Sequence, residues 1–167
     1  APEPAMDRLI AWLEAHADVP DETAIAHGDY RLGNLMLHPE EPRVIAVLDW
    51  ELSTLGDPLA DLAYALNGWV GPDDPPSPKT DIPTLDPGFP RREELAARYA
   101  ERTGADLSQL PYYSAFNHWK TVCILQGVYA RYLGGALGER SPDELQIFKQ
   151  QVDDAAAQAL EYAQRMK

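Results

Sequence analysis

Hydrophobic residues recur at helical spacing over most of the chain. Near its start, four apolar residues stand at positions i, i+3, i+4 and i+7, so they would share one face of a helix over residues 4–17. They are Met6, Leu9, Ile10 and Leu13. Similar patterns predict further helices over residues 58–69, 90–103 and 107–133, and from residue 141 to the end of the chain. The protein is therefore predicted to be mostly helical.

Residues typical of helix ends mark several of these boundaries. Asp57 is a suitable N-cap and is followed by a proline, and Ser141 and Glu144 have the spacing of a capping box. Gly104 is suited to end the helix that precedes it. Gly127 lies inside the longest predicted helix, where the missing side chain predicts a close crossing with another helix.

Between residues 25 and 55 the helical pattern gives way to short apolar runs. Residues 34–37 and 44–48 are rich in Leu, Val and Ile, and a segment with two prolines separates them, which predicts a β-hairpin. A hairpin brings the ends of its two strands together. Asn34 opens the first strand and Asp49 ends the second, so we expect these two residues to lie side by side.

Two other segments lack helical periodicity. Residues 23–26 are predicted to form a short extended run that leads into the hairpin region. Residues 70–89 are rich in Pro and Asp, which predicts a long loop. Loops of this length are usually functional lids or disordered segments. The acidic residues here would either attract a cationic substrate or simply face solvent.

Composition narrows the class of protein. With 167 residues, 45% of them hydrophobic, the chain has the size and core of a single domain spanning residues 1–167. Its net charge of −13 argues against nucleic acid or an anionic membrane as a partner. Cys123 is the single cysteine, which excludes an internal disulfide and favours a cytoplasmic location. No apolar run reaches the length that spans a membrane.

The expected hairpin end gathers oxygen-bearing side chains. Asp29 lies in the loop just before the first strand, so it would join Asn34 and Asp49. Two carboxylates about 4 Å apart repel by roughly 4 kcal/mol at an effective dielectric near 20, a cost that a bound cation removes. A few oxygen ligands suit Mg²⁺, which often completes its shell with water and phosphate oxygens. The alternative is structural: each residue would only cap a turn, bond the backbone or end a strand.

The same residues carry a resemblance to a known family. His27-Gly28-Asp29, followed after four residues by Asn34, resembles the catalytic loop of the protein-kinase superfamily, which reads His-Arg-Asp, four residues, Asn. Glycine in place of that arginine is similar to the aminoglycoside phosphotransferase and choline kinase branch.

Two further segments extend the resemblance. Residues 48–51 are similar to the metal-binding Asp segment of that branch, and residues 56–63 are similar to its next helix. The sequence of residues 46–56 resembles that of the kinase-like domains found alone in bacteria or fused to acyl-CoA dehydrogenases. These three motifs, in order and at matching spacing, cover about a quarter of the chain.

The resemblance implies a fold and a missing part. The expected fold is α+β, mostly α: the C-terminal lobe of a protein-kinase-like fold, a helical bundle with a small catalytic β-hairpin. Enzymes of this type also need an N-terminal lobe with a phosphate-covering loop and a strand Lys. Only a short predicted helix precedes His27, and no Gly-rich phosphate motif is present. We therefore expect this chain to lack the N-terminal lobe and to be inactive alone.

The resemblance also assigns roles near the transferred phosphate. Asp29 would be the catalytic base, or the group that orients the acceptor hydroxyl. Asn34 and Asp49 would hold Mg²⁺ and, through it, ATP. Arg31 stands two residues after Asp29, where protein kinases carry a Lys facing the transferred phosphate. It would either stabilise developing charge there or be a solvated loop residue.

Supporting roles follow for four more residues. His27 would brace the loop, as the equivalent His does in the family, although a ligand or base role stays open. Glu51 would reach a second metal ion or the acceptor, or only cap its loop. Asp57 and Asp61 are assigned as structural support, and Asp61 would brace the catalytic loop unless it points to solvent.

These expectations combine into a predicted function. The protein would transfer the γ-phosphoryl group of ATP, with Mg²⁺, to a hydroxyl of a small molecule, of the hydroxyacyl-CoA type or another metabolite rather than an antibiotic. One alternative is a non-catalytic pseudo-kinase that binds a nucleotide or partner. Another is a metal-dependent phosphohydrolase, which would need a richer metal cluster with His.

Overall fold

The computed structural model describes residues 4–18, 23–74, 82–135 and 141–165. Its architecture is α+β and mostly helical, as predicted. The chain forms two compact units, one from residues 1–19 and 111–167 and the other from residues 20–110. We call them the helical unit and the hairpin unit. No helix in the described ranges combines the length and apolar character needed to cross a membrane.

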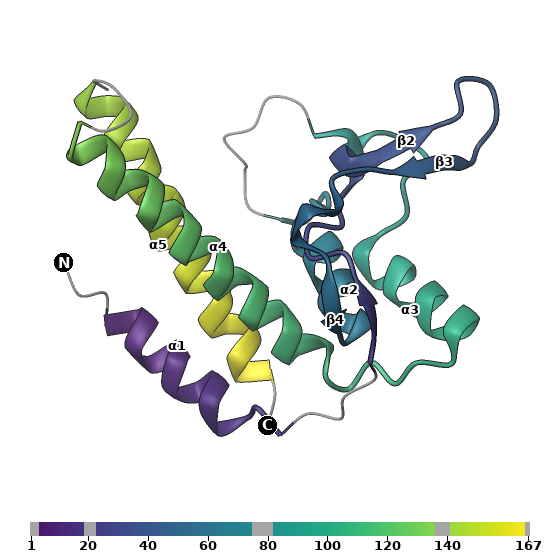
Figure 1. Ribbon diagram of the computed structural model, residues 1–167, viewed down its shortest axis with the longest axis horizontal. Coiled ribbons are helices and arrows are strands. Elements are labelled where there is room, and N and C mark those ends of the chain that lie inside the picture. Colours follow the sequence, from purple (N-terminus) through teal and green to yellow (C-terminus); the bar gives the residue numbers. More distant parts are fainter. Residues whose placement is uncertain (1–3, 19–22, 75–81, 136–140, 166–167) are drawn as a thin grey trace. The chain divides into compact units, whose positions relative to one another are not determined.

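The helical unit packs three helices around an apolar core (Figure 1). They are α1 (Pro4–Ala15), α4 (Leu110–Leu133) and α5 (Pro142–Arg165). Leu9 of α1 and Val122 of α4 are fully buried, and α5 contributes a stripe of small residues that includes Ala159. Burial of a side chain such as Leu9 contributes about 1.5–3 kcal/mol. Burial of its apolar face in this core therefore stabilises helix α1.

Two sequence predictions concern this unit: a capping box at the start of α5 and a close helix crossing at Gly127. The capping box is confirmed: the Ser141 amide donates to Glu144 Oε2 at 2.9 Å and the Glu144 amide donates to Ser141 Oγ at 3.2 Å. The close helix crossing at Gly127 is wrong. A Cβ added there would meet no atom within 4 Å, because Gly127 lies on an exposed face of α4 among the described residues.

The hairpin unit alternates short strands and 3₁₀ turns before its two α-helices (Figure 1). In chain order its elements are β1 (Ala24–Ala26), η1 (Leu32–Asn34), β2 (Leu35–Leu37), β3 (Val44–Val47), η2 (Trp50–Leu52), β4 (Thr54–Gly56), α2 (Pro58–Asn67), η3 (Pro83–Leu85) and α3 (Arg92–Thr103).

The predicted hairpin is confirmed as the antiparallel pair of β2 and β3. Leu35 pairs with Val47, and an irregularity falls between Met36 and Leu37. One residue beyond that pair, the Leu48 amide donates to the Asn34 carbonyl at 2.8 Å. This bond extends the ribbon by one step and sets the backbone of Asn34 beside the residue that precedes Asp49.

A second ribbon, which the sequence analysis did not predict, pairs β1 with β4. The strands are antiparallel, with Ala24 opposite Gly56 and Ala26 opposite Thr54. The expected extended run at residues 23–26 is thus one strand of a pair. Since residues 27–53 leave this ribbon and return to it, both ends of the candidate loop and hairpin are fixed at one place.

The predicted start of α2 and the predicted end of α3 are confirmed, whereas α2 ends two residues earlier and α3 begins two residues later than predicted. The Asp57 carboxylate caps α2 by accepting a hydrogen bond from the Leu59 amide at 2.7 Å. Helix α3 ends at Gly104, whose φ of +76° is the left-handed conformation expected of a glycine stop. The apolar face of α2 is buried and includes Leu62 and Leu66, which fixes the direction of its opposite, polar face.

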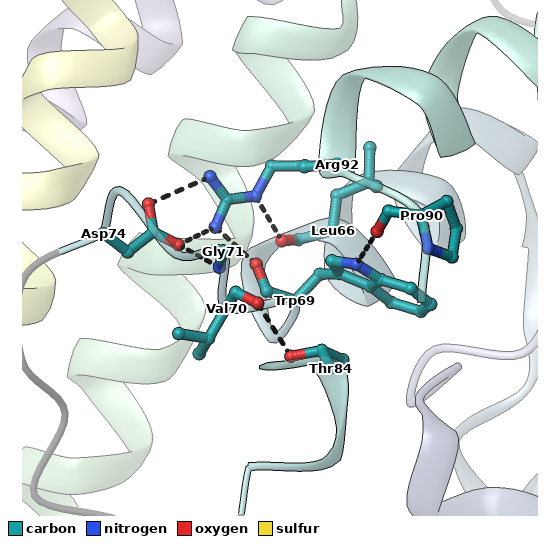
Figure 2. A network of polar contacts seen from close by, with 8 residues as sticks. All are labelled: Leu66, Trp69, Val70, Gly71, Asp74, Thr84, Pro90 and Arg92. Atoms are coloured by element: carbon teal, nitrogen blue, oxygen red, sulfur yellow. Dashed lines mark hydrogen bonds and ion pairs between the residues drawn. The ribbon is translucent and has the colours of Figure 1, made fainter. Parts of the chain in front are cut away.

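Arg92 joins the end of α2 to the start of α3 (Figure 2). Its guanidinium donates to the carbonyls of Leu66, at 3.0 Å, and Trp69, and forms an ion pair with Asp74 at 2.7 Å. The segment of residues 70–89 was predicted as a loop without periodicity, and residues 75–81 of it lie outside the described residues. Two further bonds order its described ends: Trp69 Nε1 donates to the Pro90 carbonyl and Thr84 Oγ1 to the Val70 carbonyl.

Candidate active site

The hairpin unit brings together the three residues predicted to carry the chemistry. Asp29 lies in the loop between β1 and η1, Asn34 ends η1, and Asp49 follows β3. The Leu48–Asn34 backbone bond puts Asn34 and Asp49 at the same end of the hairpin. Asp29 is linked to this end through the side chain of Asn34, as the hydrogen bonds show.

Asn34 and Arg31 both donate to the Asp29 carboxylate. Asn34 Nδ2 lies 2.8 Å from Asp29 Oδ2 and 2.8 Å from the Asp29 carbonyl oxygen. Arg31 Nε lies 3.3 Å from the same Oδ2. Only the NH₂ end of an amide donates, so these two bonds fix the orientation of Asn34. Its Oδ1 is the acceptor that these bonds leave unused, although the residue as a whole is buried.

A third donor to Asp29 comes from Tyr64 on α2. Burial raises the pKa of Asp29, but hydrogen bonds from Tyr64, Asn34 and Arg31 outweigh it and hold that pKa below its ordinary value of 3.8. Burial and the bond to Asp29 together raise the pKa of Tyr64 to about 12. At neutral pH the pair is therefore a carboxylate and a neutral phenol, and Asp29 is a weak base.

His27 ties the loop to the hairpin end. The side chain is buried, its Nδ1 accepts a hydrogen bond from the Asp29 amide at 3.2 Å, and its Nε2 lies 2.8 Å from the Leu48 carbonyl. Because Nδ1 accepts, the ring hydrogen stands on Nε2, where it donates to that carbonyl. The ring also packs against Trp50, with centroids 4.7 Å apart. Both ring nitrogens are thus used in internal contacts.

Asp61 holds the backbone of the same loop from α2. Its carboxylate accepts hydrogen bonds from the amides of His27, at 2.5 Å, and Gly28, at 2.8 Å. Gly28 has a φ of +81°, and a Cβ there would lie 2.6 Å from the Leu52 carbonyl oxygen. Glycine is therefore required both by the backbone conformation and by the close approach of the 3₁₀ turn η2.

Asp49 adopts a strained backbone conformation. Among the described residues it is the single non-glycine residue with a positive φ, at 66°. Such conformations cost on the order of 1–3 kcal/mol and cluster at functional sites. The Asp49 carboxylate is exposed and forms no capping bond to η2, which begins after it. The side chain is thus available to a ligand. Glu51, also exposed, follows within η2.

The donor set at the hairpin end suits a hard cation. Asn34 Oδ1 and the Asp49 carboxylate are oxygen ligands of the kind that Mg²⁺ takes when water and phosphate oxygens complete its shell. In the part of the chain that the structure describes, no group of three or more His, Cys, Asp or Glu side chains is arranged as a metal site. The residues therefore fit a site with few protein ligands.

Arg31 was predicted either to lie near the transferred phosphate or to be a solvated loop residue, and its position has features of both. Its side chain is half exposed and yet pairs with Asp29. A Cβ added to Gly33 would lie 2.4 Å from Arg31 Nη1, so the arginine side chain crosses directly over that glycine. The guanidinium is held beside the carboxylate while keeping access to solvent.

Tyr64 is the residue of this site that sequence analysis missed. It stands seven residues after Asp57 and three residues after Asp61, a spacing that places all three on one face of the helix. The signal was available in that spacing. An aromatic residue in an Ala- and Leu-rich helix is more often core, however, so the pattern favoured packing.

An open pocket of about 470 Å³ lies between α2 and α3, next to the loop residue Tyr30. Its wall from α2 is mainly apolar and includes Leu62 and Ala65, whereas α3 contributes Leu95 and two arginines. The arginines are Arg98 and Arg102, one helical turn apart. Asp61, the residue that holds the loop backbone, also lines this pocket.

Comparison with known proteins decides the family. A family model described as "Phosphotransferase enzyme family" matches residues 1–113, more than half of the chain. The chain belongs to the phosphotransferase enzyme family. Membership confirms the resemblance predicted from the His27-Gly28-Asp29 loop and the two motifs that follow it.

The chain is similar to parts of longer proteins. It is 44% identical to acyl-CoA dehydrogenase family member 10 of Mus musculus, over 79% of the chain and 13% of that relative. It is 39% identical to acyl-CoA dehydrogenase family member 11 of Homo sapiens, over 97% of the chain and 21% of that relative. The chain thus spans about a fifth or less of these curated relatives.

A solved structure is also similar over the whole chain. The crystal structure of a proposed aminoglycoside phosphotransferase from Ralstonia eutropha superposes with a TM-score of 0.79 and 38% sequence identity, covering 100% of this chain and 51% of that one. The kinase-like fold expected from the motifs is confirmed.

Proposed function

We propose that this chain carries the catalytic residues of an ATP-dependent kinase that transfers the γ-phosphoryl group to a hydroxyl of a small molecule. The observation that carries the proposal is the hydrogen-bonded pair of Asp29 and Asn34 at the hairpin end that also holds Asp49. Family membership supports the class of reaction. Phosphoryl transfer depends mainly on positioning and charge stabilisation, which is what such a rigid, polar loop offers.

Asn34 and Asp49 are the proposed holders of Mg-ATP. The amide orientation forced by Asp29 leaves Asn34 Oδ1 for the metal, and Asp49 adds a carboxylate that makes no capping bond. When bound, Mg²⁺ supplies charge neutralisation at the phosphates. Glu51 is the proposed further contact, to a second metal ion or to the acceptor.

Asp29 is the proposed base. Its low pKa means that it takes little of the proton before the transition state, so its main work is to orient the acceptor hydroxyl and to accept the proton late. Arg31, held beside it at 3.3 Å, would stabilise the negative charge that develops on the transferred group. His27, Asp57 and Asp61 support this loop through the bonds described above.

The acceptor is proposed to enter beside Tyr30. The pocket between α2 and α3 adjoins the loop that carries Asp29 and offers both an apolar wall and two arginines. The names of the relatives, which are acyl-CoA dehydrogenase family members, support an acceptor of the hydroxyacyl-CoA type or another small metabolite. The adenine and most of the phosphate contacts are assigned to an N-terminal lobe joined to this chain.

The experiment is a screen for ADP formation by the full-length phosphotransferase, meaning this chain together with that lobe, over a panel of hydroxyl-bearing metabolites. Asp29→Asn should lower kcat about 10²–10⁴-fold, because the orienting carboxylate is lost. Asp7→Asn, at an exposed acid of α1 outside the candidate site, is the matched control. Wild-type rates in the Asp29→Asn protein would contradict the assigned base.

A second variant tests the metal site. Asp49→Ala should weaken Mg-ATP binding and raise the Mg²⁺ concentration needed for half-maximal activity, since a carboxylate ligand is removed. Titration calorimetry with Mg-ATP measures the first effect and initial rates measure the second. An unchanged metal dependence would show that Asp49 is not a ligand, and binding of nucleotide without any turnover would favour a pseudo-kinase instead.

A further inference from the structure

Tyr64 contacts the centre of the candidate site but has no part in the function proposed above. It lies on α2, one turn after Asp61, is partly buried, and donates its hydroxyl hydrogen to the Asp29 carboxylate. Burial and Asp29 raise its pKa to about 12, so it stays a donor across the physiological range and does not act as a proton acceptor.

The origin of each donor to Asp29 distinguishes Tyr64 from the others. Arg31 and Asn34 belong to the same loop as Asp29, so they move with it. Tyr64 alone among the three comes from a packed helix. The same helix already holds the loop backbone through Asp61. Helix α2 therefore fixes the loop at two levels, the backbone through Asp61 and the carboxylate through Tyr64.

The donors to Asp29 leave few free acceptor sites on its carboxylate. A carboxylate offers about four lone-pair sites. Asn34 and Arg31 both donate to Oδ2, and Tyr64 takes a further site. Roughly one site is left for a substrate hydroxyl, so the three donors restrict the acceptor to a single direction of approach.

We propose that Tyr64 is a positioning residue for Asp29: its hydroxyl fixes the carboxylate from α2 so that one acceptor site faces the substrate hydroxyl. The proposal rests on the proposed function for its catalytic consequence. The contact itself is a property of this chain and is testable without turnover.

The catalytic test is a double-mutant cycle in the full-length phosphotransferase, with Tyr64→Phe, Asp29→Ala and the double variant. Tyr64→Phe keeps the ring and removes one hydroxyl. It should lower kcat about 10- to 100-fold through lost orientation, with the KM for ATP unchanged. In the Asp29→Ala background the same change should have almost no effect, because the group it positions is absent.

Tyr112→Phe is the matched control. Tyr112 is also partly buried, and burial alone raises its pKa. Its variant loses a comparable hydroxyl and should keep wild-type kcat. Equal losses of kcat from Tyr64→Phe with and without Asp29, or no loss at all, would overturn the positioning role.

A second cycle on the 167-residue chain tests the contact without catalysis. The free energies of unfolding in urea should be non-additive for Tyr64→Phe and Asp29→Ala, because both remove the same bond. Additive values would overturn the Tyr64–Asp29 coupling and leave the proposed function intact. Coupled unfolding energies in a protein that transfers no phosphoryl group would instead refute the proposed function and, with it, the catalytic role of Tyr64.

Discussion

At the scale of single residues, the donors around Asp29 decide what it can do. A free carboxylate rotates and is solvated, whereas Asp29 is held by Asn34, Arg31 and Tyr64. These donors make it a poorer base and a better-oriented one. A well-oriented but weak base suits phosphoryl transfer, where the acceptor proton leaves late and geometry contributes most of the rate.

The first prediction concerns Gly28. Gly28→Ala should lower the free energy of unfolding in two ways, since a positive φ costs an alanine roughly 1–2 kcal/mol and a Cβ 2.6 Å from the Leu52 carbonyl adds overpacking of about 1–3 kcal/mol. Urea denaturation followed by circular dichroism measures the total.

Gly104→Ala separates the two contributions. Gly104 has a φ of +76°, close to that of Gly28, but a Cβ there would meet no atom within 4 Å among the described residues. It should therefore show only the backbone cost. If Gly28→Ala were no more destabilising than Gly104→Ala, the close approach of η2 to the loop would be wrong.

Motif spacing was enough to predict where Asp29, Asn34 and Asp49 would meet, because a hairpin forces its ends together. It was not enough for Tyr64. That residue lies on a helix, 35 residues after Asp29 in the chain, and whether an aromatic residue in such a helix faces core or site depends on how the helix is rotated. Rotation is set by tertiary packing, which local pattern does not contain.

At the scale of elements, the two ribbons show why one pairing was predictable and the other was not. β2 and β3 are joined by a short turn with prolines, so their pairing is local. β1 and β4 are three residues each and are separated by the whole loop and hairpin. Strands this short carry almost no alternation, and only the folded loop between them brings them together.

The Arg92 network gives a prediction for the joint between α2 and α3. Arg92→Ala should lower the free energy of unfolding by about 2–3 kcal/mol, because the carbonyls of Leu66 and Trp69 lose their donor and Asp74 loses its partner. Arg91→Ala is the control: its ion pair with Asp73 is 62% and 82% exposed and should contribute less than about 1 kcal/mol.

The same network has a predictable pH dependence. Burial raises the pKa of Asp74, but bonds from Arg92 and the Gly71 amide outweigh it, so the folded-state pKa lies below 3.8. A depressed pKa stabilises the fold above the unfolded-state value and loses that effect as pH falls through the folded value. The difference between wild type and Arg92→Ala should therefore shrink below pH 3.8. Equal differences at pH 3 and pH 7 would refute the ion pair.

At the scale of the whole molecule, the chain corresponds to a fraction of its relatives: 21% of the human relative and 51% of the solved chain. A kinase-like enzyme holds ATP between two lobes, and the described residues supply acids, an amide and arginines from one side. We therefore predict that the 167-residue chain alone forms ADP at a small fraction of the rate of the full-length phosphotransferase.

Coupled-enzyme assays of the two proteins at equal concentration measure this difference. Adding the separately expressed N-terminal lobe to the chain is the informative control, since partial recovery would locate the deficit in nucleotide holding rather than in misfolding. Full ATP turnover by the chain alone would contradict the assignment of the missing contacts to another lobe.

The β1–β4 ribbon has a consequence for how the protein could be rebuilt. Residues 27–53 lie between the two paired strands, so the ribbon closes a segment that contains every proposed metal ligand and the proposed catalytic base, Asp29. The far tip of that segment, the turn between β2 and β3, is largely exposed. Peptides grafted into this tip would leave the paired strands untouched, whereas loss of the pair between Ala26 and Thr54 would loosen the base of the segment that carries all of those groups.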